Sequence, residues 1–336
     1  MNLKSFEYIC KMHNQLDLKK YLRKELEKYY TTIIEESGFL YVPSENVDIM
    51  LTAHMDVIHP KKCKKIYKVK RDGKEALWSP QGIGGDDRCG VFMILEILRN
   101  TDLRPAIVFC EDEEIGGKGS MKFADWLSKK ADTKELNIKY IIELDRRNDN
   151  DAVFYDCGNE EFIKYITETT GYKKAEGSFS DIGNISPELD VASVNLSCGY
   201  YKEHTLDHYV IPEEMERTYQ TTILLLTESI NVDKFDYQEI KYNYGLGYNY
   251  GYGYNYGYNY LGGTKSWYGY DDDEEIYYIV AIHNGMEVAE EYDAAVDEYD
   301  AILSFLMEHD DVCYGEVVYV GSKEEWDSYY KYDRVV

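Results

Sequence analysis

Short apolar runs alternate with longer amphipathic segments along most of the chain. A run of about four to eight mostly apolar residues is typical of a buried strand, and apolar residues recurring every three or four positions indicate a helix that faces a core. Strands alternating with helices predict an α/β fold, with a mostly parallel central sheet flanked by helices on both faces. The expected strands are residues 47–53, 106–110, 137–144, 152–156 and 191–196, and the expected helices are residues 15–36, 91–98, 160–170 and 212–230.

The pattern changes after this α/β region. Residues 242–260 read YNYGLGYNYGYGYNYGYNY, a low-complexity tract with nine tyrosines and no charged residue. Glycine at this density favours an unfolded backbone, whereas tyrosine supplies adhesive, hydrogen-bonding rings. We interpret the tract as a tethering linker, with a self-associating or carbohydrate-contacting segment as the alternative.

A small module is predicted beyond the tract. Strands are expected over residues 275–282 and 315–320, a helix over residues 287–308, and a further helix capped by Ser322. A unit of about 60 residues is small for an independent core, so it is expected to dock on a partner or to self-associate. The predicted domains are a catalytic domain at residues 1–232, a Tyr/Gly/Asn-rich linker at 233–270 and a small acidic α/β module at 271–336.

Charge and composition exclude several classes of protein. The 336 residues include 63 acidic and 37 basic side chains, for a formal net charge of −26. This argues against nucleic-acid binding, which needs a basic surface, and against binding to an anionic membrane. No apolar stretch is long enough for a transmembrane helix, and the N-terminus does not resemble a signal peptide. The seven cysteines include no CxxC pair, so reduced thiols and a cytoplasmic location are expected.

The acidic residues are concentrated in the C-terminal module. Residues 271–336 hold 20 acidic and three basic side chains. If the module has a protein partner, its charge predicts that the partner surface is basic.

Residues of metal-binding types follow the expected strands at their carboxyl ends. In an open α/β sheet these ends lie along one edge, where ligands bind. Imidazole nitrogen and carboxylate oxygen are donors that zinc accepts, and a series of such positions is hard to explain as solvated loop charges. The candidates are His54 and Asp56 after residues 47–53, Asp86 in the glycine-rich segment GIGGDDRCG, Glu113 and Glu114 after residues 106–110, Asp145 after residues 137–144, and His204 after residues 191–196.

These residue types suit a hydrolase with two divalent metal ions, for which zinc is the expected element. Two ions about 3.5–4 Å apart need a carboxylate that bridges them. Asp86 is the expected bridge, because two glycines precede it and allow the backbone to approach closely. His54 and Asp145 are expected to complete the site of one ion, and Glu114 and His204 that of the other.

Glu113 is the expected general base, because it adjoins a metal ligand without being one. It would take a proton from the metal-activated water and later give this proton to the leaving amine. Asp56 is expected to bind the second ring nitrogen of His54 and thereby fix its tautomer.

Together these residues resemble the co-catalytic zinc exopeptidases, which include the M28 aminopeptidases and the M20 and M42 peptidases. The resemblance covers residues 1–232 and implies the same metal ligands, the same bridge and Glu113 as the base. Because Asp145 and His204 are 59 residues apart, no inserted domain is expected between them, and the compact M28 type is the nearest resemblance. The motifs are His54-x-Asp56, GGDD at 84–87, DEE at 112–114, Asp145, and His204 within GYYKEHT.

Several residues beside these motifs have more ordinary interpretations. Asp87 is the alternative to Asp86 as the bridge. Glu111 and Asp112 are interpreted as loop charges or as support for the metal site. His59 and His208, which are near the two ligand histidines in sequence, are interpreted as loop or surface residues.

For other residues near the motifs, two interpretations are possible from the sequence. Arg88 is expected in a structural ion pair, with contact to a substrate carboxylate as the alternative. Tyr200 and Tyr201 either donate a hydrogen bond to the oxyanion of the reaction or pack. Asp181 is a candidate for metal-site support or substrate contact. The cysteines near the motifs, expected to be small buried side chains rather than zinc ligands, are Cys89, Cys110 and Cys198.

The sequence therefore predicts a di-zinc hydrolase that cleaves a peptide bond, most consistent with an exopeptidase of aminopeptidase type. Its substrate would be a peptide or a small amide. Two alternatives remain: a deacylase or deacetylase acting on a non-peptide amide at the same site, and a non-catalytic binding protein on the same fold. The linker and the acidic module are expected to serve self-association or binding to a protein partner.

Overall fold

The computed structural model describes residues 1–71, 73–129, 136–177, 179–238, 277–283, 286–292, 305 and 317–321. The chain forms two compact units, Met1–Glu239 and Ile240–Val336. The candidate site residues all belong to the first unit. The boundaries expected at residues 232 and 270 stay a prediction, and the Tyr/Gly tract lies outside the described residues.

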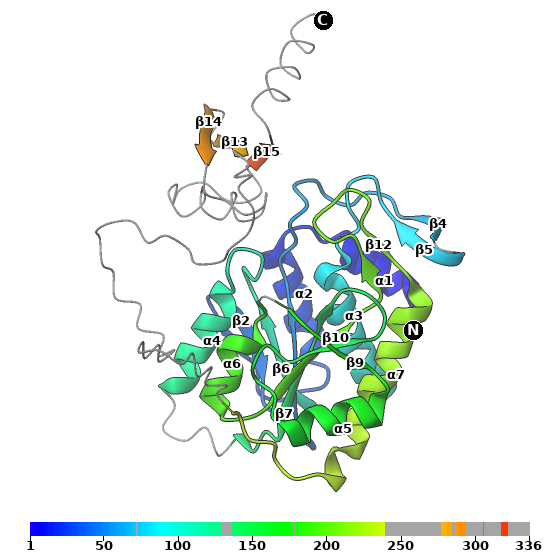
Figure 1. The fold of residues 1–336 in the computed structure, drawn as a ribbon, viewed down its shortest axis with the longest axis vertical. Helices are drawn as coiled ribbons and strands as arrows, with labels where there is room; N and C mark the ends of the chain where they lie inside the picture. Colours follow the sequence, from blue (N-terminus) through cyan, green and yellow to red (C-terminus); the bar gives the residue numbers. More distant parts are fainter. Residues whose placement is uncertain are drawn as a thin grey trace, which may run out of the picture. The chain divides into compact units, whose positions relative to one another are not determined.

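An eight-stranded sheet forms the centre of the first unit (Figure 1). Its order is β1-β2-β6-β3-β7-β10-β8-β9. The four middle strands, β6, β3, β7 and β10, run parallel to one another, whereas β2 and β8 pair antiparallel with them. The mostly parallel sheet predicted from the sequence is thus confirmed. The strands are β1 (Ile34–Glu36), β2 (Phe39–Val42), β3 (Val47–His54), β6 (Pro105–Cys110), β7 (Tyr140–Arg146), β8 (Asp151–Val153), β9 (Lys173–Ala175) and β10 (Ser193–Ser197).

Helices cover both faces of this sheet (Figure 1). Successive side chains of a strand point to opposite faces, so β3 contributes Leu51 to one apolar core and Met50 to the other. The Leu51 core includes residues of α1, α2, α3, α5 and α7, and the Met50 core includes residues of α4 and α6. The helices are α1 (Leu3–Cys10), α2 (Gln15–Leu26), α3 (Gly85–Asn100), α4 (Lys118–Ser128), α5 (Glu160–Thr170), α6 (Ile182–Leu189) and α7 (Pro212–Glu228). None of the described helices is long and apolar enough to cross a membrane.

Two element boundaries differ from the prediction. The helix expected over residues 15–36 ends at Leu26, and Ile34–Glu36 forms the edge strand β1 paired with β2. The charged residues continue past Leu26, but β-branched residues follow them, and these favour a strand. The strand expected over residues 137–144 begins at Tyr140 and continues through Asp145, so this candidate ligand lies within β7.

A second, four-stranded antiparallel sheet in the order β11-β12-β5-β4 was not predicted. Two of its strands, β4 and β5, form a hairpin that lies between β3 and α3 in the sequence. The other two, β11 and β12, follow β10. The loop between β11 and β12 carries His204, so this sheet determines where that side chain lies. The strands are β4 (Tyr67–Arg71), β5 (Lys74–Trp78), β11 (Tyr200–Tyr201) and β12 (Tyr209–Val210).

The second unit contains a three-stranded antiparallel sheet in the order β14-β13-β15. Strands β13 (Tyr277–His283) and β15 (Val317–Gly321) confirm two of the predicted strands. The predicted helix over residues 287–308 is wrong at its beginning, because β14 (Met286–Tyr292) pairs with β13 along its whole length. Residues 293–304 and the helix expected from Ser322 lie outside the described residues.

Candidate metal centre

The candidate residues meet at the carboxyl edge of the central sheet. His54 ends β3, and the loop after β6 carries Glu113 and Glu114. Asp145 lies near the end of β7. Since β6, β3 and β7 are adjacent and parallel, their carboxyl ends lie side by side. The start of α3 and the loop between β11 and β12 then add Asp86 and His204 to the same place.

Asp86 lies between the two histidines. Its Oδ1 atom is 2.9 Å from His54 Nε2, and its Oδ2 atom is 3.4 Å from His204 Nε2. Each histidine has one more carboxylate beside it: Asp145 Oδ1 is 3.5 Å from His54 Nε2, and Glu114 Oε2 is 3.0 Å from His204 Nε2. The Asp86 carboxylate therefore presents one oxygen to each half of the cluster.

The donor atoms are close enough to share ions. In one group, donor atoms of His54, Glu113 and Asp145 all lie within 4.8 Å of one another, and in a second group those of His54, Asp86 and Glu114 do so. Imidazole nitrogen with carboxylate oxygen is a donor set that suits zinc. The residues present thus fit a divalent metal centre.

Asp56 holds three parts of this cluster together. Its Oδ1 atom is 3.1 Å from His54 Nδ1. The backbone N–H groups of Glu113 and Glu114 donate to its two carboxylate oxygens, each at 3.0 Å. With Nδ1–H donating to Asp56, the Nε2 atom of His54 is the one left for a metal ion.

Asp87 and Tyr200 hold residues of the cluster in place through hydrogen bonds. The buried Asp87 carboxylate accepts hydrogen bonds from the backbone N–H groups of His54, at 3.2 Å, and Gly90, at 2.8 Å. The Tyr200 hydroxyl donates to the carbonyl and carboxylate oxygens of Asp145, at 3.0 and 3.2 Å. This hydrogen bonding favours a role for Tyr200 in holding Asp145.

The cluster carries a large excess of buried negative charge. Burial raises the pKa of Glu113 well above its ordinary value, and the nearby Asp145 raises it further while His54 opposes the shift. Burial, followed by the charge of Asp86, raises the pKa of Asp145 to about 8. Burial alone would lower the pKa of His204, but hydrogen bonds to Asp86 and Glu114 raise it to about 11. Divalent cations would relieve this repulsion between carboxylates.

Two predicted surface residues are in fact buried. His59 and His208 both lie in loops, as expected, but His59 is only 6% exposed and His208 is fully buried, so neither is a surface residue. Their rings lie 5.4 Å apart, and His59 Nε2 is 2.9 Å from the carbonyl oxygen of Thr205. The His59 ring therefore contacts the loop that carries His204, and the His208 ring packs beside it.

Arg88 is buried among backbone carbonyl groups. Its side chain is 1% exposed, and its guanidinium donates to the carbonyl oxygens of Met55, at 2.7 Å, and Met12, at 3.0 Å. The expected ion pair is replaced by these bonds to carbonyls, while the structural role is confirmed.

Asp181 is also fully buried, which excludes substrate contact in this conformation. The cysteines expected to be buried are so, and their thiols are free: Cys89, Cys110 and Cys198.

Two side chains of α2 that no sequence motif marks reach the loop after β6. Gln15 bonds to Asp112, and Lys19 forms a buried ion pair with Glu111 at 2.7 Å. The support role considered for Glu111 and Asp112 is therefore the one that the structure favours. A helix pattern gives no signal for such contacts, because the partners are more than 90 residues apart.

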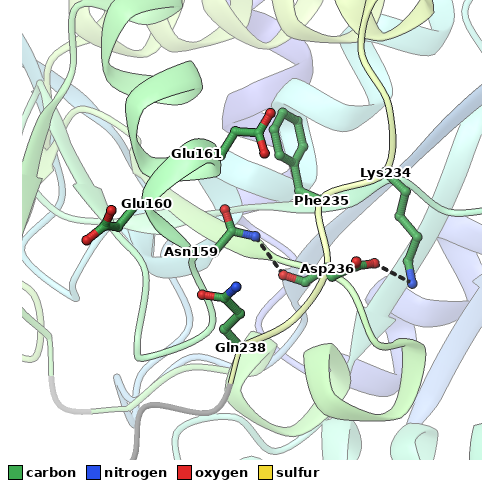
Figure 2. Close-up of a pocket in the computed structure, with 7 residues that line it drawn as sticks. All are labelled: Asn159, Glu160, Glu161, Lys234, Phe235, Asp236 and Gln238. Atoms are coloured by element: carbon green, nitrogen blue, oxygen red, sulfur yellow. Dashed lines mark hydrogen bonds and ion pairs between the residues drawn. The ribbon is translucent and has the colours of Figure 1, made fainter.

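A pocket of about 350 Å³ lies between the start of α5 and the segment that follows α7 (Figure 2). Phe235 in its lining donates to the carbonyl oxygen of Lys139 and accepts from the N–H group of Ala192. These residues precede β7 and β10, so the pocket adjoins the amino ends of strands whose carboxyl ends face the metal cluster. Its side chains offer no arrangement suited to catalysis. The lining residues are Asn159, Glu160, Glu161, Lys234, Phe235, Asp236 and Gln238.

Solved peptidase structures share this fold. The aminopeptidase PepT from Bacillus cereus ATCC 10987 superposes with a TM-score of 0.51 and 16% identity, over 68% of this chain and 98% of that one. A tripeptidase from Staphylococcus aureus subsp. aureus Mu50 superposes with a TM-score of 0.53 and 12% identity, over the same shares of the two chains. No family model and no curated protein matches the sequence.

The fold of the first unit is similar to that of these aminopeptidase and tripeptidase structures. At these identities the likeness establishes the architecture alone. It agrees with the predicted co-catalytic zinc peptidase resemblance at the level of the fold, and it does not single out the M28 type.

Proposed function

We propose that this protein is a metal-dependent peptidase that removes residues from the amino end of a peptide. The observation that carries the proposal is the position of Asp86, whose two carboxylate oxygens face His54 and His204 separately. A carboxylate in this position is what a pair of ions requires as a bridge. The similarity of the fold to that of two solved peptidases supports the same conclusion.

Five side chains would hold the metal ions. Asp86 would serve both, with His54 and Asp145 on one side and Glu114 and His204 on the other. When bound, two divalent cations, most suitably Zn²⁺, supply Lewis acidity that polarises the scissile carbonyl and lowers the pKa of water toward ~7.

Glu113 would act as the general base. Its carboxylate reaches the cluster at 4.0 Å from His54 Nε2, and its backbone N–H is fixed by Asp56. In the reaction Glu113 removes a proton from the attacking water and transfers it to the nitrogen of the leaving amine. Tyr200 and Asp56 keep Asp145 and His54 in place during this transfer.

The charge around the cluster favours a substrate with a free amino end. Buried carboxylates outnumber the ligands that the metal ions would use, and those not balanced by bound cations attract an ammonium group and repel a carboxylate. Arg88, the cation next to the Asp86–Asp87 pair in sequence, already donates to backbone carbonyls. Arg88 is therefore not free to bind a substrate carboxylate, which favours an aminopeptidase over a carboxypeptidase.

A deacylase on the same metal centre is the second candidate. The same residues would hydrolyse any amide that reaches the cluster, so the choice depends on whether the substrate has a free or an acylated amine. A non-catalytic binding protein is less well supported, because every residue required for hydrolysis is present in the cluster.

A paired substrate panel tests the proposal. The zinc-loaded protein is assayed with aminoacyl-p-nitroanilides and with the same compounds acetylated at the amine. We expect hydrolysis of the free amines, and none by Glu113→Gln, which should keep its zinc. Glu75→Gln, an exposed substitution on β5, serves as the matched control. Release of acetate from the acetylated compounds would support the deacylase instead, and no hydrolysis of either series would contradict both enzyme proposals.

A further inference from the structure

Helix α2 contacts the loop that carries Glu113 and Glu114 through the two residues that precede them, Glu111 and Asp112. The Gln15 side chain binds Asp112 twice: its Nε2 donates to Asp112 Oδ1 at 2.5 Å, and its Oε1 accepts from the Asp112 N–H at 3.1 Å. One turn along the same helix, Lys19 Nζ donates to Glu111 Oε1 at 2.7 Å. Two consecutive residues of the loop are thus held by one face of one helix.

The Lys19–Glu111 pair is buried and fully engaged. Both residues are nearly inaccessible, at 5% and 6% exposure. Lys19 also donates to the carbonyl oxygen of Glu36, and Glu111 Oε2 accepts from the N–H of Gly38 at 3.1 Å. A buried ion pair satisfied in this way fixes the geometry of its surroundings more than it adds stability. Here it fixes the residue at which the loop leaves β6.

The bond to Gln15 holds an unusual backbone conformation. Asp112 has φ +57°, in the left-handed region that residues other than glycine seldom adopt. This turn directs the following two backbone N–H groups, those of Glu113 and Glu114, toward the carboxylate of Asp56. If Asp112 relaxed to an ordinary conformation, both N–H groups would turn away from Asp56.

We propose that Gln15 and Lys19 of α2 are positioning residues that clamp the loop 111–114 and so hold the general base at the metal cluster. The inference rests on the proposed function, because it takes Glu113 to be the base. The clamp itself is a property of the loop and exists with or without a substrate. Gln15 acts through Asp112, and Lys19 acts through Glu111.

The test compares Gln15→Leu with a control on the same helix. Gln15→Leu removes both bonds to Asp112 while preserving side-chain size, and the partly exposed site allows the protein to fold. Lys20→Met changes an exposed side chain of α2 that does not contact the loop. Two measurements are made on zinc-loaded protein: kcat and KM for an aminoacyl-p-nitroanilide, and hydrogen–deuterium exchange of a peptide spanning residues 111–117.

We expect Gln15→Leu to lower kcat on the order of tenfold, the equivalent of about 1.4 kcal/mol, with KM unchanged. Exchange at the N–H groups of Glu113 and Glu114 should rise by a similar factor, while Lys20→Met changes neither. Adding Asp112→Gly to Gln15→Leu should restore most of the kcat, because glycine adopts a positive φ without a clamp.

Wild-type kcat and exchange in Gln15→Leu would overturn the inference, and so would a loss that Asp112→Gly does not reduce. The exchange measurement separates this inference from the proposed function. If the wild-type protein hydrolysed no substrate, the proposed function would fail. Faster exchange in Gln15→Leu alone would still show that α2 clamps the loop.

Discussion

The Nδ1 atom of His54 lies 3.1 Å from Asp56 Oδ1, and Asp56 is itself held by two backbone N–H groups of the neighbouring loop. One carboxylate thus connects a candidate ligand on β3 to the candidate base and a second ligand after β6. Burial would raise the pKa of Asp56, but its hydrogen bond to His54 and those from the Glu113 and Glu114 amides lower it. Asp56 is therefore a charged acceptor over the working pH range.

Replacing Asp56 should damage metal binding and catalysis together. Asp56→Ala frees the His54 ring and leaves two backbone N–H groups without their acceptor. Loss of such an outer partner typically costs about 10–100-fold in metal affinity or activity, and we expect both losses here. Zinc titration and kcat/KM measure them, with exposed Asp17→Ala on α2 as the control. Unchanged zinc affinity in Asp56→Ala would refute this role.

Metal ions should stabilise the fold. The buried carboxylates repel one another, so binding cations to the folded state lowers its free energy. A metal ion present at 100 times its Kd adds about 2.7 kcal/mol to the free energy of unfolding for each site. This corresponds to a rise in Tm of roughly 5–10 °C for a unit of this size. Thermal unfolding in chelator and then in added zinc measures the shift. Asp86→Asn should lose most of it, and an equal shift in that variant would contradict the assignment of Asp86 as the bridge.

The positions of the site residues were predictable because they follow a rule of topology. Parallel strands bring their carboxyl ends to one edge, so His54, Glu113 and Asp145 could be placed together from three apolar runs. No such rule applies to Gln15 and Lys19. Their contacts depend on how α2 packs across the loop after β6, which the periodicity of the helix does not specify.

The features that the sequence did not predict were missed for different reasons. The hairpin of β4 and β5 is short and mostly exposed, so it lacks an apolar run, although the Asp-Gly pair at 72–73 is a turn signal. Strand β14 reads MEVAEEY, with helix-favouring Glu and Ala, but pairing with β13 outweighs this local preference. His208 is buried because its ring packs against those of His59 and Tyr200, and the contact with His59 joins residues far apart in the sequence.

Acid should destabilise the protein through His208. Burial, then the nearby His59, lowers the pKa of His208 from 6.5 to about 3. Below pH 6.5 the unfolded chain therefore binds a proton that the folded protein does not accept until the pH falls to about 3. The stability contributed by neutral His208 is complete above pH 6.5 and is lost as the pH falls, by about 2 kcal/mol between pH 7 and pH 5.

A variant isolates this contribution. Among the described residues neither ring nitrogen of His208 has a hydrogen-bond partner, so His208→Leu removes a titrating group without breaking a bond. Urea unfolding of both proteins, in chelator at pH 7, 6 and 5, should show a weaker loss of stability in His208→Leu. Parallel pH profiles for the two proteins would show that His208 does not titrate as described.

The most direct test of the metal centre is anomalous X-ray scattering from crystals of the zinc-loaded protein, measured on either side of the zinc absorption edge. We expect two peaks that flank the Asp86 carboxylate, one beside His54 and Asp145 and the other beside Glu114 and His204. The same experiment on His204→Ala should keep the first peak and lose the second. No peak among these side chains, or zinc bound only elsewhere on the protein, would contradict the proposed metal centre.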